Sequence, residues 1–322
     1  MKNINSVAKF FIVCGVIFCI GMVLTIGGAA AGGVDGMKKI AEKNDWISDG
    51  PGELTSDYYL DVDGFDKVDV SGDADVFLVT EKYFTDKDWL DDHDLGRALA
   101  TIEGSPDPEA GQVLVLRGDQ VEKPEVKTEK GVLTIKAPDM VHDGINLNFS
   151  DVMVTPQVYV FCRDDELESI KADMLSGDLN CTGISFKKAD IDSASGDVSM
   201  KDVTGKSATM TLTSGDAKLS GKLSDTNIDC KSGDVKMSGK LTGETLISLA
   251  SGDAEIDAEL AAKEYTLDLK AISGDLKISD GGEEEEIDEY PAEVQRGDGP
   301  NKIKIETASG DIDISFQMPV EL

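Results

Sequence analysis

An aspartate recurs at nearly constant intervals through the second half of the chain, each time inside the tripeptide Ser-Gly-Asp. From the copy that starts at Ser176, successive copies are 19, 19, 18, 19, 22 and 36 residues apart, and an outlying copy starts at Ser71. If the copies stack in register, their carboxylates form a ladder with steps of about 4.8 Å. Like charges at that spacing repel unless backbone amides or cations compensate them. The candidate cation ligands are therefore Asp178, Asp197, Asp216, Asp234 and Asp253.

The same tripeptide also has a purely structural interpretation. Glycine adopts backbone conformations with positive φ that other residues resist. Serine and aspartate side chains bond to neighbouring backbone amides in turns. In this interpretation the tripeptide is a turn and binds no ligand. Its glycines are Gly177, Gly196, Gly215, Gly233, Gly252, Gly274 and Gly310.

Apolar residues flank each copy at fixed offsets. The third and fifth residues after the serine are apolar, as in Val198 and Met200, and so is the fourth residue before it, as in Ile191. Alternation with a period of two predicts strands with one buried face. Units of this length bury their apolar side only by stacking on one another. The sequence therefore predicts an all-β fold, a parallel β-solenoid of coils of about 19 residues with two strands each.

Two segments interrupt this pattern, a polar insertion at residues 86–111 and an acidic segment at residues 279–302. The doubled spacing before Ser309 predicts a degenerate coil with a protruding loop, because a charge run is typical of a solvated loop. The apolar alternation after Ser309 predicts a last strand that caps the stack. Both interruptions are candidate recognition segments, and the candidate residues of the acidic loop are Glu283, Glu284, Glu285 and Glu286.

The N-terminal residues differ in composition from the rest of the chain. No charged residue occurs from Phe10 to Val34, whereas Lys2 and Lys9 precede this stretch and an acidic chain follows it. About 20 apolar residues cross a bilayer as a helix, and flanking lysines favour a cytoplasmic N-terminus. We expect a single-pass protein of the cell membrane, with most of the chain extracellular. A cleaved signal peptide that ends near Ala29 is the alternative.

This organisation divides the chain into four parts. We expect the first part to contact the lipid bilayer, which its N-terminal helix would cross. The predicted parts are the cytoplasmic tip and transmembrane helix at 1–34, a juxtamembrane linker at 35–60, an N-terminal β region with the polar insertion at 61–170, and the Ser-Gly-Asp repeat solenoid at 171–322.

Charge and motif content narrow the classes of function. A net charge of -32 repels nucleic acid and anionic headgroups and attracts cations and basic peptides. The chain has no G-x-S-x-G or H-E-x-x-H motif and no phosphate-binding glycine loop, and its only histidines are His93 and His142. We expect no catalytic residue, no cofactor and no nucleic-acid partner. Without a C-x-x-C pair, the cysteines beyond the apolar stretch are expected to be free, buried thiols: Cys162, Cys181 and Cys230.

The turns Ser195-Gly196-Asp197-Val198 and Ser232-Gly233-Asp234-Val235 resemble those of the bacterial putative-adhesin family of β-strand-repeat proteins. The upstream segments 131–135 and 156–160 also look like the family's pattern, so the resemblance covers about residues 61–322. It implies a membrane-anchored surface protein of Gram-positive bacteria and brings no catalytic residue. It also implies a link to envelope-stress regulation, which some relatives have.

Two classes of function follow from these observations. The first is a non-enzymatic, membrane-anchored adhesin or binding scaffold for cell-envelope or host-surface ligands. The alternative is an envelope-stress sensor that responds to cations or cationic peptides. Integrin contact through Arg117-Gly118-Asp119 or Arg296-Gly297-Asp298 is a further hypothesis, although a chain this rich in Gly-Asp forms such triplets by chance.

Overall fold

The structure is a computed structural model, and it describes residues 58–62, 64–84, 88, 112–116, 124–137, 156–163 and 166–317. All of them belong to one compact unit, which consists of Gly52–Asp139 and Met153–Leu322. Their strands form one sheet of 20 strands. Besides strands, the described part holds the short helix α3 (Glu81–Phe84) and the 3-10 turn η2 (Ala262–Glu264).

The described residues are mostly β, as predicted, and their strands pair largely in parallel. The strands are β1 (Tyr58–Asp61), β2 (Lys67–Ser71), β3 (Asp75–Thr80), β4 (Gln112–Leu116), β5 (Glu125–Glu129), β6 (Val132–Lys136), β7 (Gln157–Cys162), β8 (Leu167–Ser176), β9 (Leu179–Thr182), β10 (Ser185–Ser195), β11 (Val198–Leu212), β12 (Ala217–Cys230), β13 (Val235–Leu249), β14 (Ala254–Ala258), β15 (Tyr265–Ala271), β16 (Leu276–Asp280), β17 (Glu283–Ile287), β18 (Ala292–Arg296), β19 (Asn301–Thr307) and β20 (Ile312–Phe316).

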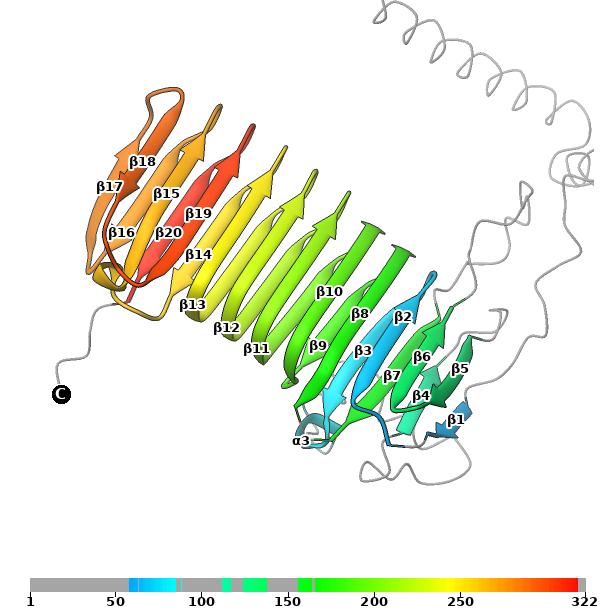
Figure 1. The fold of residues 1–322 in the computed structure, drawn as a ribbon. Helices are drawn as coiled ribbons and strands as arrows, with labels where there is room; N and C mark the ends of the chain where they lie inside the picture. The colour runs from blue at the N-terminus through cyan, green and yellow to red at the C-terminus, as the bar shows by residue number, and fades with distance from the viewer. Residues whose placement is uncertain are drawn as a thin grey trace, which may run out of the picture. The chain divides into compact units, whose positions relative to one another are not determined.

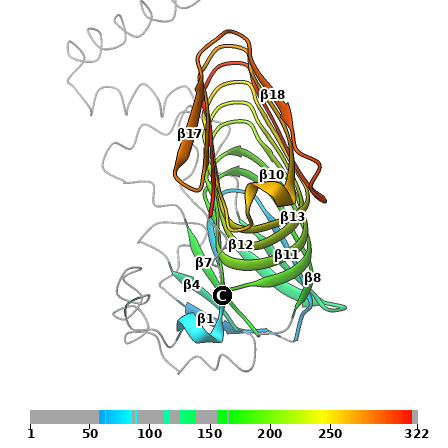
Figure 2. The same cartoon turned by 90° about the vertical axis from the view of Figure 1, so that its left-hand side faces the viewer.

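Successive coils of the repeat region pair in parallel and in register. Val198 of β11 lies opposite Ala217 of β12, which in turn lies opposite Val235 of β13. Because neighbouring strands lie about 4.8 Å apart, each coil lengthens the stack by that distance. Figure 1 shows the row of coils, and Figure 2 shows how they overlie one another when viewed along the row. The predicted stacking of the repeats is confirmed.

Each central coil turns once at its Ser-Gly-Asp tripeptide and bends a second time further along the chain. At this second corner the chain bends without ending the strand. β12 runs without a break from Ala217 through Gly221 to Cys230. Gly221 has a φ of 129°, and Gly239 of the next coil repeats this conformation with 111°. The sequence pattern predicted two short strands for each coil, with the Ser-Gly-Asp turn between them. In β11, β12 and β13 the strand that leaves one such turn continues through the bend into the strand that leads to the next turn.

Inward-pointing apolar side chains form columns along the stack. At the third position after the serine, Val198, Ala217, Val235 and Ala254 are each at most 1% exposed. Full burial of a valine side chain contributes about 1.5–3 kcal/mol, and the alanines of the column contribute less because they bury less apolar surface. The apolar residues that the pattern marked as inward-facing form the continuous core of the stack.

At the C-terminal end the coils do not follow the order of the chain. β20 lies between β14 and β16, and β19 lies between β13 and β15. The chain therefore skips one coil position, builds the outermost coil with β15 and β16, and returns to fill the gap. The prediction that the last strand caps the stack was wrong. The outer edges are instead covered by β17 on β16 and β18 on β15, both antiparallel, which lie on opposite flanks in Figure 2.

The N-terminal end is built in the same way. β2 lies between β6 and β8, and β3 lies between β7 and β9, so an early segment fills an inner coil. The outermost coil carries antiparallel β5 on β6 and β4 on β7, and β1 pairs with β4. Antiparallel strands thus protect both ends of a parallel stack. The predicted boundary between residues 170 and 171 falls inside β8, where the sheet is continuous.

The glycines of the Ser-Gly-Asp turns form a column in which each backbone touches the next. A Cβ atom on Gly233 would lie 2.0 Å from the carbonyl oxygen of Gly215, and one on Gly252 would lie 2.0 Å from that of Gly233. The φ angles are positive as well, 144° at Gly233 and 134° at Gly252. Side chains are excluded from this column both by the neighbouring coil and by the backbone conformation.

Several predicted features lie outside the described residues. They include the apolar stretch from Phe10 to Val34, both histidines, the triplet that starts at Arg117, and the insertion at 86–111 apart from Asp88. Among the helices of the described part, none has the length and apolar character needed to traverse a bilayer.

We predict that Gly233→Ala destabilises the stack by about 3 kcal/mol, because the new methyl group overlaps the carbonyl of Gly215 and the φ is strained. Gly282→Ala is the matched control, since Gly282 also has a positive φ of 89° but nothing within 4 Å of its added Cβ. It should lose about 1 kcal/mol. Urea unfolding of both variants measures the difference, and equal losses would contradict the steric explanation.

Candidate functional site

The recurrent aspartates link neighbouring coils through their side chains. Oδ1 of Asp178 accepts the backbone N–H of Asp197 at 2.8 Å, and Oδ1 of Asp197 accepts that of Asp216 at 2.8 Å. Asp216 accepts the N–H of Asp234 at 3.0 Å, and Asp234 accepts that of Asp253 at 2.9 Å. One oxygen of each carboxylate from Asp178 to Asp234 is therefore bonded to the next turn. The predicted ladder of five aspartates is assembled in the structure.

The ladder continues beyond these five residues. Asp253 bonds to the amide of Asp311, and Asp311 bonds to the amide of Asp275, both at 2.8 Å. At the other end, Oδ1 of Asp75 accepts the N–H of Asp178 at 3.0 Å. The outlying tripeptide at Ser71 is not equivalent to the repeats, because Asp75, rather than the aspartate of that tripeptide, occupies the ladder position.

Backbone amides thus compensate the closely spaced carboxylates, because a hydrogen bond to an ionised acceptor is stronger than one between neutral groups. Within the described ranges, no three His, Cys, Asp or Glu side chains are grouped so that they could hold a metal ion. The Ser-Gly-Asp turn therefore has a complete structural explanation. Cation binding by the second carboxylate oxygens stays a prediction.

Burial perturbs the acid at the start of the ladder. Desolvation, together with the neighbouring charge of Asp178, raises the pKa of the half-buried Asp75 carboxyl above its ordinary range, although the hydrogen bond to the Asp178 amide opposes this shift. Next to it, the ring of Tyr159 stacks on Phe77 with centroids 4.3 Å apart. Burial also raises the pKa of Tyr159. These shifts follow from packing, and they mark the interior of the stack.

The glutamate run forms a strand rather than the predicted loop. Glu283 to Glu286 lie in β17, which pairs antiparallel with β16 through the turn Gly281-Gly282. Gly-Gly between two strand segments is one of the signals of a two-residue β-hairpin turn, but the charge run was interpreted as a loop instead. Lys277 Nζ lies 3.1 Å from Glu284 Oε2, and an Arg296 nitrogen lies 2.5 Å from Glu285 Oε2. Ligand recognition by the run stays a prediction.

The three cysteines of the described part are free and buried, as expected. Cys181 of β9 lies opposite Leu78 of β3, and β3 separates β9 from β7, which carries Cys162. The two cysteines are one repeat length apart in the sequence, but their coils are not adjacent. Burial raises the pKa of the Cys162 thiol to about 12, so this thiol stays protonated and unreactive at neutral pH.

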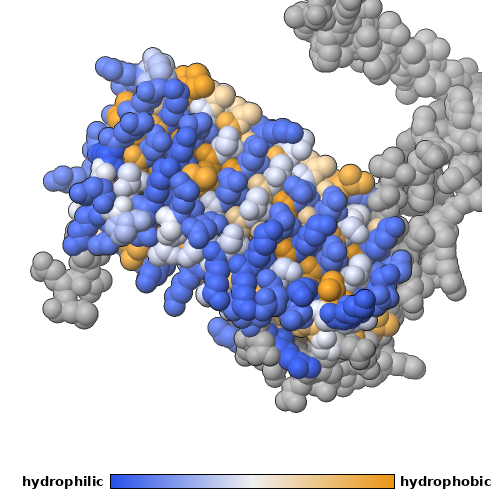
Figure 3. All heavy atoms as spheres, in the orientation of Figure 1, coloured by the Kyte–Doolittle hydropathy of each residue, from blue (hydrophilic) through white to orange (hydrophobic). Residues whose placement is uncertain are grey.

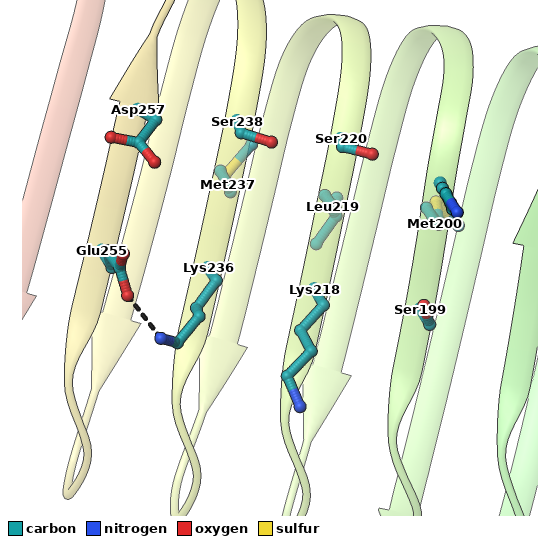
Figure 4. A pocket seen from close by; sticks show the side chains of 11 residues that line it. Ser199, Met200, Lys218, Leu219, Ser220, Lys236, Met237, Ser238, Glu255 and Asp257 are labelled. Carbon is teal, nitrogen blue, oxygen red and sulfur yellow. Dashed lines mark hydrogen bonds and ion pairs between the residues drawn. The ribbon is translucent and has the colours of Figure 1, made fainter. Parts of the chain in front are cut away.

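Sequence reasoning missed a shallow groove that crosses β11, β12, β13 and β14. Its volume is about 410 Å³, and buried Met200, Leu219 and Met237 form its floor. Figure 4 shows Lys218 and Lys236 extending from neighbouring strands. The signal was present in the sequence as two matching segments, Lys218-Leu219-Ser220-Gly221-Lys222 and Lys236-Met237-Ser238-Gly239-Lys240.

We predict that Asp216→Ala destabilises the protein by about 1–2 kcal/mol, because it leaves the amide of Asp234 without its acceptor. Asp216→Asn is the matched control, since it keeps an Oδ1 acceptor and removes only the charge. Its loss should be less than half that of the alanine variant. Thermal unfolding of both variants in the same buffer tests this expectation. An asparagine variant as unstable as the alanine variant would assign the effect to charge instead.

Comparisons with known proteins found similar solved structures at low sequence identity and low TM-score. No curated protein matches the chain. A putative cell adhesion protein from Clostridium sporogenes shares 13% identity and a TM-score of 0.34, covering 82% of this chain and 100% of its own. A putative adhesin from Bacteroides fragilis shares 13% identity and a TM-score of 0.33, covering 83% and 98%. A putative lipid binding protein from Parabacteroides distasonis shares 12% identity and a TM-score of 0.28, covering 84% of this chain and 98% of its own.

The sequence also matches a family defined over most of the stack. The match extends over residues 113–315, from β4 at one end to β20, and so includes the Ser-Gly-Asp turns from Ser176 onward, the aspartate ladder apart from Asp75, and the groove. By this match, the chain belongs to the Toastrack DUF4097 family.

Proposed function

We propose that this protein is a membrane-anchored, extracellular β-scaffold that binds ligands of the cell envelope or of a host surface and catalyses no reaction. The observation that carries the proposal is the register of the stack. Strands paired residue by residue place outward side chains of neighbouring coils in straight columns about 4.8 Å apart. Such extended, repetitive surfaces are typical binding surfaces of repeat proteins.

The exposed surface supports a binding role in solution. Figure 3 shows a face dominated by hydrophilic side chains, with apolar ones scattered among them. Among the described residues the large exposed apolar side chains are Leu175, Ile272 and Tyr290. Polar and charged columns therefore offer the contacts, and a ligand recognised by them is itself polar or charged.

Anchoring in the membrane is proposed from the composition of the N-terminal residues. The uncharged stretch from Phe10 to Val34 is long enough to cross a bilayer, and Lys2 and Lys9 favour a cytoplasmic start. The stack would then be held outside the cell by the segment that precedes β1. Membrane attachment would raise the local concentration of the scaffold at the envelope, which favours weak, multivalent contacts.

Chemical considerations support a role without catalysis. The three thiols of the described part are buried, and burial raises their pKa values. Tyr265, whose pKa is raised to about 12, donates its hydroxyl to the carbonyl of Leu241 at 3.0 Å. Its hydroxyl is thus committed to the packing of the stack.

The proposal is tested with the full-length chain in neutral detergent, mixed with purified envelope fragments and sedimented. We expect the wild-type protein to sediment with the fragments in a saturable manner. The Gly233→Ala variant, held above its melting temperature while it is mixed with the fragments, controls for nonspecific adsorption. Failure of the folded protein to sediment with any envelope fraction, or equal sedimentation of the unfolded control, would contradict a scaffold role.

Protease treatment of intact cells tests the predicted exposure of the stack.

The alternative, a sensor of cations or cationic peptides, is favoured by the aspartate column. Asp197, Asp253 and Asp311 are exposed, and each uses only Oδ1 within the stack, where it accepts the backbone N–H of another aspartate. If the remaining oxygens bind cations, millimolar Ca²⁺ should raise the melting temperature, and the rise should be smaller in Asp197→Asn/Asp216→Asn. A melting temperature that calcium leaves unchanged would remove calcium sensing by the ladder.

A further inference from the structure

Lysine lies directly opposite lysine at one place in the sheet. Lys218 of β12 faces Lys236 of β13, and four residues later Lys222 faces Lys240. Across all strand pairs that the structure describes, these are the two positions where lysine is paired with lysine. Like charges directly opposite each other destabilise a sheet. We call these four residues the lysine patch.

Elsewhere the sheet places lysines opposite acids or opposite uncharged residues, as in Lys188–Ser207. The lysine patch is therefore an exception among the strand pairs that the structure describes. The lysine–acid pairs include Lys171–Asp190, Lys302–Glu244, Lys304–Asp268, Lys270–Glu306 and Lys277–Asp313. In a chain with a net charge of -32, acids were abundantly available for the same positions.

The patch is only partly neutralised by its neighbours. Lys236 Nζ lies 2.5 Å from Glu255 Oε2, and Lys218 Nζ lies 3.4 Å from Asp216 Oδ2, with both lysine side chains 53% exposed. Lys222 and Lys240 are exposed, and among the described residues neither has an ion-pair partner. The second pair of the patch therefore carries two uncompensated positive charges on adjacent strands.

Hydroxyl groups lie between the two lysine pairs. Ser220 faces Ser238 midway between the pairs, and both line the groove in Figure 4. The oxygen of Ser220 accepts the N–H of Asp202 at 3.1 Å, which leaves its own proton available to an outside acceptor. Gly221 and Gly239 bend the two strands between the lysine pairs, so the path along each strand from one pair to the other is at most about 13 Å. The patch thus presents ammonium, hydroxyl and ammonium groups in succession around this corner.

We propose that the lysine patch binds a linear polymer with phosphate groups in its backbone, and this assignment rests on the scaffold function proposed above. Each lysine pair holds one phosphate, because two ammonium groups on strands about 4.8 Å apart can both donate to its oxygens. A tetrahedral phosphate offers acceptors in several directions, including toward the serines. The polymer runs along β12 and β13 and neutralises the repulsion between the paired lysines.

The charges around the patch favour a narrow ligand over a flat one. Asp202 borders the patch on β11, while Glu255 and Asp257 border it on β14. An anionic bilayer laid on this face would meet those carboxylates as well as the lysines. A single polymer chain that follows β12 and β13 stays clear of the acids on β11 and β14, which also confine it to one path.

The test uses the full-length chain in neutral detergent and long-chain inorganic polyphosphate as the probe, with affinity measured by calorimetry. We expect wild-type binding that weakens as salt increases, since the contact is ionic and exposed. Lys222→Gln/Lys240→Gln should weaken it at least about tenfold. Lys171→Gln/Lys188→Gln is the matched control, because it removes the same charge from two exposed lysines on β8 and β10. It should change the affinity less than about twofold.

Other outcomes would overturn the assignment. They are absence of polyphosphate binding by the folded wild-type protein, equal weakening in the control variant, and binding of inorganic phosphate as tight as that of the polymer. Patch-dependent binding of phosphatidylglycerol–phosphatidylcholine vesicles without polymer binding would assign the patch to a membrane instead. Lys222→Arg/Lys240→Arg should retain binding, and the melting temperatures of all variants show that they are folded.

The envelope sedimentation assay separates this inference from the scaffold function. If the wild-type protein sediments with envelope fragments but does not bind polyphosphate, the scaffold stands and the ligand assignment fails. If polyphosphate binds at the patch while no envelope fraction is sedimented, the site stands and its proposed place in the envelope fails.

Discussion

The stack depends on the close approach of one backbone to the next at the Ser-Gly-Asp turn. From Gly196 onward, each turn glycine lies so near the carbonyl of the turn glycine in the neighbouring coil that a single methyl group would overlap it. The adjacent aspartate then ties its carboxylate to the next amide, as Asp197 does for Asp216. Both contacts fix the register of neighbouring coils at the corner. Once the corner is in register, the inward apolar columns and the outward polar columns follow from the alternation of the strands.

Much of this arrangement is written in local sequence. The period of the tripeptide and the alternation around it predict parallel coils with a continuous core, because both depend on residues that are close in the chain. The order of the end coils could not be predicted in this way. That Glu244 pairs with Lys302 across 58 residues depends on which free edge the returning chain meets. No local pattern around either residue records that choice.

The candidate sites show the same division. The aspartate ladder was predicted from spacing and is present. It also includes Asp75, which lies two residues after the aspartate of the first tripeptide and accepts the amide of Asp178. The acidic segment was misinterpreted because composition was weighed above the Gly281-Gly282 hairpin signal. The lysine patch could not be predicted because it is defined by the residue paired with each lysine on the neighbouring strand. Cross-strand partners become known only when the register is known.

The way both ends are built changes how the stack responds to force. A repeat array whose coils follow chain order can be peeled from its tip, one coil after another. Here the outermost coils are formed by segments from the interior of the chain. The C-terminal strands β19 and β20 pair with β13 and β14 on one side and with β15 and β16 on the other. Tension on that end would have to extract a coil held on both sides, so the load is shared by several ladders at once. For a protein proposed to be tethered at a cell surface, this arrangement of the ends would make the stack resist unfolding under tension.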